Sequence, residues 1–199
     1  MTSHITTISS VCYYQLRCLK QVRRVQVRRV LGENITSRPL SPFVISQLDY
    51  CSAILAGLRQ SMMDPFHHVQ NAAVRMVKRL GSCDHITEAR RNLHWLSIKY
   101  HVIYKLCILM HMVHIGCGPG YISELVSAMS ALPGRSRLCS PGGKRYEIPV
   151  IHHKIGERTF SYAGPAAWNS LPTTPTNLTD TQTFKSSLKT YLFKLVYNL

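Results

Sequence analysis

Residues 62–80 carry the pattern that most restricts the fold. When successive residues are placed about 100° apart, the apolar side chains of this segment fall in a stripe about 100° wide. The stripe consists of Phe66, Val69, Ala73, Met76, Val77 and Leu80. The opposite side carries Arg75, Lys78 and Arg79. The spacing therefore predicts an amphipathic helix with an apolar face for a core and a basic face for solvent or phosphate, ended by Gly81.

The rest of the chain predicts a mainly α fold. Further helices are expected over 3–31, 43–58, 87–93, 97–115, 121–129 and 180–195. The helix over 97–115 is apolar around more than half of its circumference, so we expect it at the centre of the core. Thr179 and Gln182 form a capping-box pattern at the start of the last helix.

A change of pattern after residue 144 predicts a small β element. Tyr146, Ile148 and Val150 alternate with polar residues, which indicates a β-hairpin or an extended pair over 145–163. Residues 165–171 are expected to form an aromatic turn around Trp168. The predicted organisation is a basic N-terminal helical segment (1–42), a helical core (43–129), a flexible linker (130–144), and a region with the β element, aromatic turn and C-terminal helix (145–199).

The charge balance favours a polyanionic partner. The chain has 24 Lys and Arg against 9 Asp and Glu, a formal net charge of +15. The densest cluster contains no acid and consists of Arg17, Lys20, Arg23, Arg24, Arg28 and Arg29. Uncompensated clustering of this kind favours contact with nucleic-acid phosphates over a merely solvated face or an acidic membrane surface.

The compartment is predicted to be intracellular, either nuclear or cytoplasmic. The N-terminus has neither a basic start nor an apolar core of a signal peptide, so secretion is not expected. The longest apolar run, Val102–Ile115, is too short to span a bilayer. Seven cysteines without an export signal are expected to be reduced thiols.

Catalytic patterns are absent from the sequence. The acids are scattered, and only Asp84 and Glu88 stand at helical spacing, with Asp84 expected to cap the helix that begins near Ile86. Two-metal phosphoryl transfer needs clustered carboxylates, which the chain lacks. No phosphate-binding glycine loop, nucleophile elbow or zinc-protease motif occurs. We therefore expect no enzymatic activity, no cofactor and no small-molecule substrate.

Cys107, His111, His114 and Cys117 are the best candidates for metal ligands. The first three lie within about 60° on the predicted helix, on its less apolar side, and the set suits zinc. A buried thiol with two histidines at a helix boundary is the favoured alternative. The pairs His67–His68 and His152–His153 are predicted to be surface residues. Trp95 and Trp168 are expected to anchor the core rather than to stack on bases.

A series of short motifs resembles one known family. In chain order they are Leu48-Asp49-Tyr50-Cys51, Val69-Gln70-Asn71-Ala72-Ala73-x-Arg75, Asp84-His85-Ile86-Thr87, Leu93-His94-Trp95-Leu96, Gly118-Pro119-x-Tyr121-Ile122, Gly156-x-Arg158-x-Phe160, Ala163-x-Pro165-x-x-Trp168-Asn169-Ser170-Leu171-Pro172 and Phe184-Lys185-x-x-Leu188-Lys189-x-x-Leu192-Phe193. The series resembles the C-terminal region of the polyprotein of non-LTR retrotransposons, in the jockey and chicken-repeat type lineages of animals.

The resemblance implies a helical region that follows the fingers, palm and thumb of a reverse transcriptase. The catalytic acids of the polymerase and endonuclease lie upstream in that family, so none maps onto this chain. One hypothesis is a binding module that contacts RNA or DNA phosphates. Its expected contacts are Arg17, Lys20, Arg23, Arg24, Arg28, Arg29, Arg75, Lys78 and Arg79. The alternative is an orphaned docking domain that packs on the thumb of the reverse transcriptase domain of a parent element.

Overall fold

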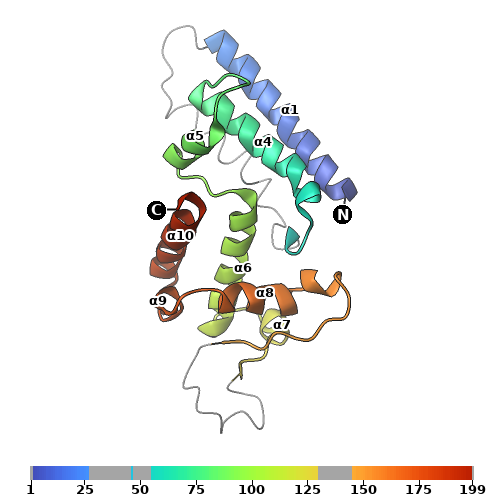
Figure 1. Ribbon diagram of the computed structural model, residues 1–199, viewed down its shortest axis with the longest axis vertical. Helices are drawn as coiled ribbons and strands as arrows, with labels where there is room; N and C mark the ends of the chain where they lie inside the picture. The colour runs from blue at the N-terminus through green and yellow to red at the C-terminus, as the bar shows by residue number, and fades with distance from the viewer. Residues whose placement is uncertain (1, 27–45, 47–54, 130–144, 199) are drawn as a thin grey trace. The chain divides into compact units, whose positions relative to one another are not determined.

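The computed structural model describes residues 2–26, 46, 55–129 and 145–198. It confirms the mainly α class, and these residues include no β-strand. The helices are α1 (Thr2–Gln26), α4 (Gln60–Lys78), α5 (Ile86–Asn92), α6 (Ile98–His114), α7 (Gly120–Ser123), the 3-10 helix η4 (Gly156–Arg158), α8 (Phe160–Asn169), α9 (Thr173–Thr176) and α10 (Thr181–Tyr197) (Figure 1). The helix predicted over 43–58 falls largely outside the described residues.

The chain divides into two compact units. Unit 1 comprises Met1–Ser52 and Leu58–Lys99, and unit 2 comprises Ala53–Gly57 and Tyr100–Leu199. Helices α1, α4 and α5 belong to unit 1, and α7 to α10 belong to unit 2. The predicted domain boundaries near residue 42 and at 130–144 fall on residues that the structure does not describe, so that division stays a prediction.

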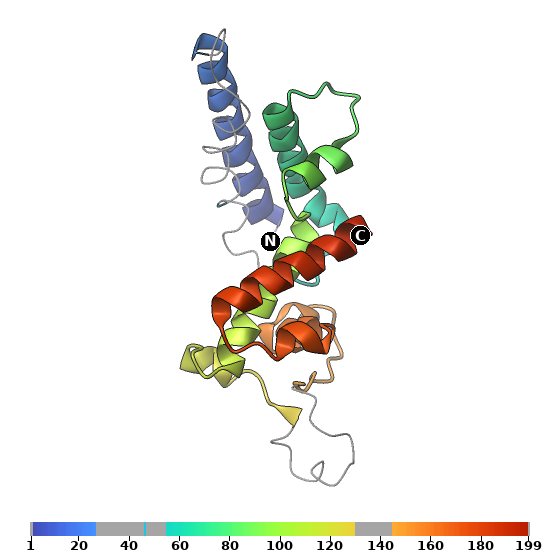
Figure 2. The same cartoon turned by 90° about the vertical axis from the view of Figure 1, so that its left-hand side faces the viewer.

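The core of unit 1 forms where α1 packs along α4 (Figure 2). Ile5, Cys12 and Leu16 of α1 are buried, and so are Phe66 and Val69 of α4. Burying each large apolar side chain contributes about 1.5–3 kcal/mol. This gain compensates for the weak intrinsic helix propensity of Thr, Val and His, which are frequent in these helices. The predicted apolar stripe of α4 is therefore confirmed as the face that meets the core.

The turn after α4 differs from the prediction. Arg79 ends the helix in the left-handed conformation, with φ of 57°. The carboxylate of Asp84 accepts a hydrogen bond from the Gly81 backbone N–H at 2.6 Å and so closes the turn between the helices. The N-cap of α5 is His85, without a side-chain capping bond. The prediction that Asp84 caps this helix is wrong because its carboxylate is engaged one turn earlier.

The core of unit 2 is built from α6, α8 and α10. Leu106 and Met110 of α6 are buried, together with Trp168 of α8 and Phe184 of α10. A Cβ added at Gly164 of α8 would lie 2.9 Å from the sulfur of Met110, so glycine permits this close approach. The burial of Trp168 confirms the prediction that it anchors the core, whereas Trp95 is only half-buried.

Residues 145–163 do not form the predicted β-hairpin, and residues 165–171 do not form the predicted turn. Tyr146 makes an isolated bridge to Ala128, and its main chain is held by Asn169: Tyr146 N–H donates to Asn169 Oδ1 at 3.1 Å, and Asn169 Nδ2 donates to the Tyr146 carbonyl at 2.8 Å. The segment 160–169 is instead the helix α8. Helical winding in this segment brings Ala163 and Trp168 into the core.

The helices of unit 2 also correct two predicted boundaries. In the segment expected to be helical over 121–129, α7 ends at Ser123, and Ala128 lies in the bridge instead. The cap of α10 is Asp180, whose carboxylate accepts hydrogen bonds from the Thr183 N–H at 2.7 Å and the Thr183 hydroxyl at 2.6 Å. The capping box predicted at Thr179 and Gln182 is therefore wrong, and the N-cap lies one residue later, at Asp180.

Candidate nucleic-acid interface

The exposed side of α1 carries the first cations of the candidate interface. Ile8, Cys12 and Leu16 are buried in the core, so the remaining side of the helix is solvent-exposed. Arg17 and Lys20 both lie on this exposed side. No Asp or Glu occurs between Thr2 and Gln26, so no carboxylate of the helix compensates these charges. The arrangement gives one helix face a positive potential that attracts anions.

The structure describes only part of the predicted N-terminal cluster. Arg23 and Arg24 belong to α1, but their side chains lie outside what the structure describes. Arg28 and Arg29 lie wholly outside the described residues. The contribution of these four arginines therefore stays a prediction.

The end of α4 supplies the second set of cations. Arg75 and Lys78 are half-buried, and Arg79 is exposed. A guanidinium nitrogen of Arg75 (Nη1) donates to the Gly81 carbonyl, so this side chain also fastens the turn that follows the helix. Cations in the last turn of a helix interact favourably with its carboxyl-terminal dipole. Arg75 thus has a structural role that the sequence pattern does not reveal.

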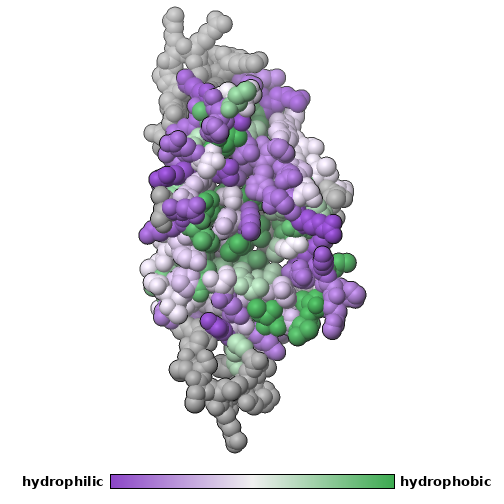
Figure 3. Space-filling model, viewed as in Figure 1, coloured by the Kyte–Doolittle hydropathy of each residue, from purple (hydrophilic) through white to green (hydrophobic). Residues whose placement is uncertain are grey.

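Helix α5 adds two arginines that the sequence reasoning missed. Arg90 is half-buried and its Nη2 donates to Asn71 Oδ1 of α4 at 3.5 Å, while Arg91 is exposed. The adjacent Arg90–Arg91 pair was the available signal. We define the basic surface of unit 1 by the described cations Arg17, Lys20, Arg75, Lys78, Arg79, Arg90 and Arg91. Hydrophilic side chains (purple in Figure 3) lie over much of α4 and α5 on the face shown.

The pKa of His67 is lowered by burial and by the positive charge of Arg90. Burial is the largest cause that lowers the pKa of His67 below 6.5, and the Arg90 guanidinium lowers it further. Asp64 opposes the shift and His68 adds to it. The Nε2 atom of His67 is buried without a hydrogen-bond partner, so the prediction of a surface His67 is wrong, whereas His68 is exposed.

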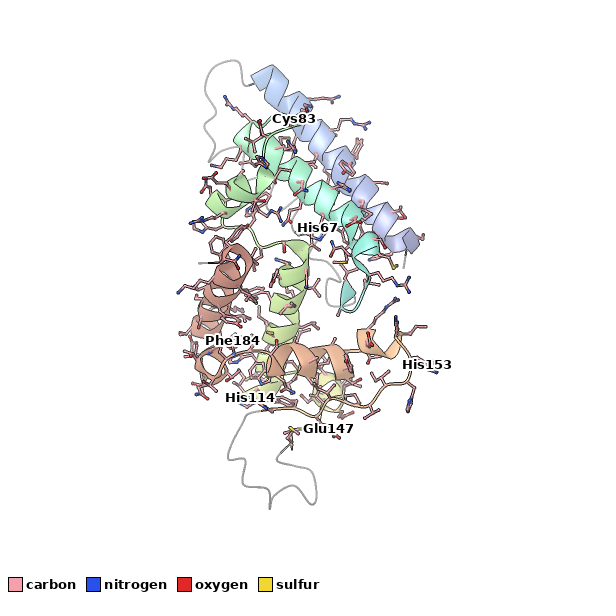
Figure 4. The ribbon with its side chains drawn as sticks, viewed as in Figure 1. His67, Cys83, His114, Glu147, His153 and Phe184 are labelled. Atoms are coloured by element: carbon pink, nitrogen blue, oxygen red, sulfur yellow. The ribbon has the colours of Figure 1, made fainter. Side chains whose placement is uncertain are left out.

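The predicted metal ligands of unit 2 occupy different environments. Cys107 and His111 are fully buried, which agrees with the favoured alternative of a buried thiol, and Cys117 is exposed. Burial raises the pKa of the Cys107 thiol to about 12, so it carries its proton at neutral pH. His114 Nδ1 lies 3.1 Å from the Tyr146 hydroxyl, and the ring of Phe184 stacks on that of His111. His114 and Phe184 are labelled in Figure 4.

No metal centre emerges from the part of the chain that the structure describes. None of its groups of three or more His, Cys, Asp or Glu side chains is placed to hold an ion. The described cysteines, including Cys107 and Cys117, are free thiols. The described Asp64, Asp84 and Asp180 engage in local hydrogen bonds.

Comparisons with known proteins identify no relative of this chain. No protein-family model, curated protein or solved structure matches this chain. Among the described helices, none combines the length and apolar character needed to cross a membrane.

Proposed function

We propose that this chain is a non-catalytic nucleic-acid-binding region that contacts the phosphates of RNA or DNA through the basic surface of unit 1. In this proposal it is the C-terminal part of a non-LTR retrotransposon reverse transcriptase, and the polymerase and endonuclease acids lie elsewhere in the parent protein. The motif series from Leu48 to Phe193 supports the family. The exposed, acid-free face of α1 supports the activity.

The observation that carries the binding proposal is the placement of Arg17 and Lys20. Both are exposed on a helix whose other side is buried, and the helix has no carboxylate with which to pair them. A structural cation on a surface helix is commonly balanced by an acid one turn away. Side chains that are positive, exposed and uncompensated are suited to phosphate, whose contacts position a nucleic acid without reading its sequence.

A charge-matched comparison of variants tests this proposal. Arg17→Gln/Lys20→Gln removes two cations from α1, and Lys189→Gln/Lys194→Gln removes two exposed cations from α10. We expect the α1 pair to weaken oligonucleotide binding at low salt several-fold, about equally for unrelated sequences, because phosphate contacts carry no sequence information. The α10 pair controls for net charge. Equal losses from both pairs would contradict a localised interface.

A second function is favoured by a different observation. Unit 2 exposes large apolar side chains, among them Tyr121 (70%), Val150 (87%) and Ile155 (75%). Exposed apolar surface is typical of a docking face. In this second proposal the chain is an orphaned structural domain that packs on the thumb of its parent polymerase. A folded protein without salt-dependent affinity for oligonucleotides would favour docking over the binding module.

A further inference from the structure

Two tyrosines lie beside the cations of α1. Tyr14 is 67% exposed and Tyr13 is 41% exposed, so the rings of both are accessible to a binding partner. The two tryptophans are less accessible, because Trp168 is buried in the core, as the sequence predicts, and Trp95 is half-buried. The exposed rings of α1 therefore need a different explanation from core packing.

Helical spacing brings these rings and the cations onto one face. Arg17 follows Tyr13 by four residues and Tyr14 by three, and such pairs are neighbours on a helix surface. Lys20 continues this line by one further turn. Gln21 lies one turn beyond Arg17, and all of these side chains are exposed. The face thus alternates flat aromatic surface with positive charge and hydrogen-bond donors.

The chemistry of this face selects one class of polyanion. Unpaired nucleotides present both a phosphate and an accessible base face, so a ring next to a cation can engage both. In a duplex the base faces are stacked inside, and only phosphates and base edges are accessible. A pair of cations alone would bind single strands and duplexes alike. The tyrosines favour single strands because their rings can stack only on unpaired bases.

We propose that the exposed face of α1, formed by Tyr13, Tyr14, Arg17, Lys20 and Gln21, binds single-stranded nucleic acid, with a base stacked on Tyr14 and phosphates held by Arg17 and Lys20. This inference deepens the proposed function and rests on it. Tyr14 is assigned the stacking position because its ring is the more exposed of the two. Stacking on any base is compatible with this face, so the preference is for unpaired strands rather than for a sequence.

The test combines ring-deleting variants with oligonucleotides that lack bases. Binding of the full chain is measured by fluorescence anisotropy to a labelled single strand, to its duplex, and to an abasic strand of the same length. Tyr14→Leu removes the ring but keeps an apolar side chain, and Tyr14→Phe keeps the ring. Tyr121→Leu, at a tyrosine of α7 that is 70% exposed, is the matched control. Circular dichroism checks that each variant folds.

We expect Tyr14→Leu to weaken single-strand binding about fivefold to hundredfold, the range typical of one base stacked on an aromatic ring. The same variant should leave binding to the duplex and the abasic strand unchanged. Tyr14→Phe and Tyr121→Leu should bind the single strand like the wild type. The slope of log affinity against log salt should also be unchanged in Tyr14→Leu, because the deleted ring carries no charge.

Three results would overturn the inference. Equal binding of the single strand by Tyr14→Leu and wild type would exclude stacking, as would an equal loss on the abasic strand. Binding of polyglutamate as tight as that of the oligonucleotide would indicate an acidic protein partner instead. If Arg17→Gln/Lys20→Gln still weakens oligonucleotide binding in the first two cases, the proposed function stands without the single-strand preference. If no nucleic acid binds at low salt, the proposed function itself fails.

Discussion

The imidazole of His111 stacks on the ring of Phe184, with ring centroids 4.0 Å apart and planes inclined by only 4°. His111 comes from α6 and Phe184 from α10, and both side chains are 0% exposed. Trp168 of α8 joins the cluster, with its ring 5.8 Å from that of Phe184. One stack therefore links the helices that form the core of unit 2.

This relationship predicts that Phe184 is a principal source of stability in unit 2. Phe184→Ala deletes a buried ring and leaves a cavity, so we expect the free energy of unfolding to fall by about 3–5 kcal/mol. Urea denaturation followed by circular dichroism measures the loss. Leu195→Ala on the same helix is the control, because Leu195 is 49% exposed and should change stability by less than about 0.5 kcal/mol. Similar losses from both variants would contradict this core.

The depressed pKa of His67 predicts a pH-dependent stability. The unfolded chain titrates this residue near pH 6.5, whereas the folded protein protonates it only at lower pH. Below about pH 6.5 the unfolded state therefore binds more protons, and stability decreases as pH falls toward the folded-state pKa. Melting temperatures between about pH 5 and pH 7.5 measure the effect. His67→Gln should flatten this profile, and a profile unchanged by His67→Gln contradicts the assignment.

The cap of α10 predicts a second pH dependence of stability, which comes from hydrogen bonds to a carboxylate rather than from burial of a histidine. Hydrogen bonds from Thr183 lower the pKa of the Asp180 carboxyl below 3.8, so the ionised cap stabilises the folded protein above that pH. This stability is lost as pH falls through the lowered pKa. Asp180→Ala should reduce the melting temperature by a few degrees at pH 7, whereas Asp180→Asn, which can also cap, should lose less. Identical melting curves for Asp180→Ala and wild type would contradict the cap.

The left-handed conformation of Arg79 predicts a stabilising substitution. A non-glycine residue with φ of 57° is strained, and glycine has no Cβ to cause that strain. We expect Arg79→Gly to raise the free energy of unfolding by about 0.5–1 kcal/mol after the entropy of the unfolded glycine is included. Arg79→Ala loses the same side chain but keeps the strain, so it isolates the backbone effect. A glycine variant no more stable than the alanine variant would argue against this geometry.

The sequence predicted the long helices well because their apolar periodicity extends over many turns. The expected segments 62–80, 97–115 and 180–195 correspond to Gln60–Lys78, Ile98–His114 and Thr181–Tyr197. The failures lie where local signals conflict with packing. Pro165 begins the segment expected to be a turn, yet it is buried within α8, next to Gly164, which permits the close contact with Met110.

The candidate site also contains residues that the sequence could identify and features that only the folded structure shows. Clustering along the chain identified Arg17 and Lys20, because both lie on one continuous helix. It could not show that Arg75 fastens a turn through the Gly81 carbonyl, since that bond depends on how the chain folds back after α4. It also missed the exposure of Tyr14, because a tyrosine in an amphipathic helix is compatible with either side until the packing against α4 is known.

The salt dependence of oligonucleotide binding by the whole chain tests the central claim most directly. If the basic surface and the remaining predicted arginines neutralise about four phosphates, a plot of log affinity against log salt is linear with a slope of about −3 to −4. The measurement uses fluorescence anisotropy over about 50–300 mM salt, a range in which counterion release dominates. The account predicts this slope, and a smaller slope after Arg17→Gln/Lys20→Gln. Undetectable binding at the lowest salt, or an affinity independent of salt, would contradict it.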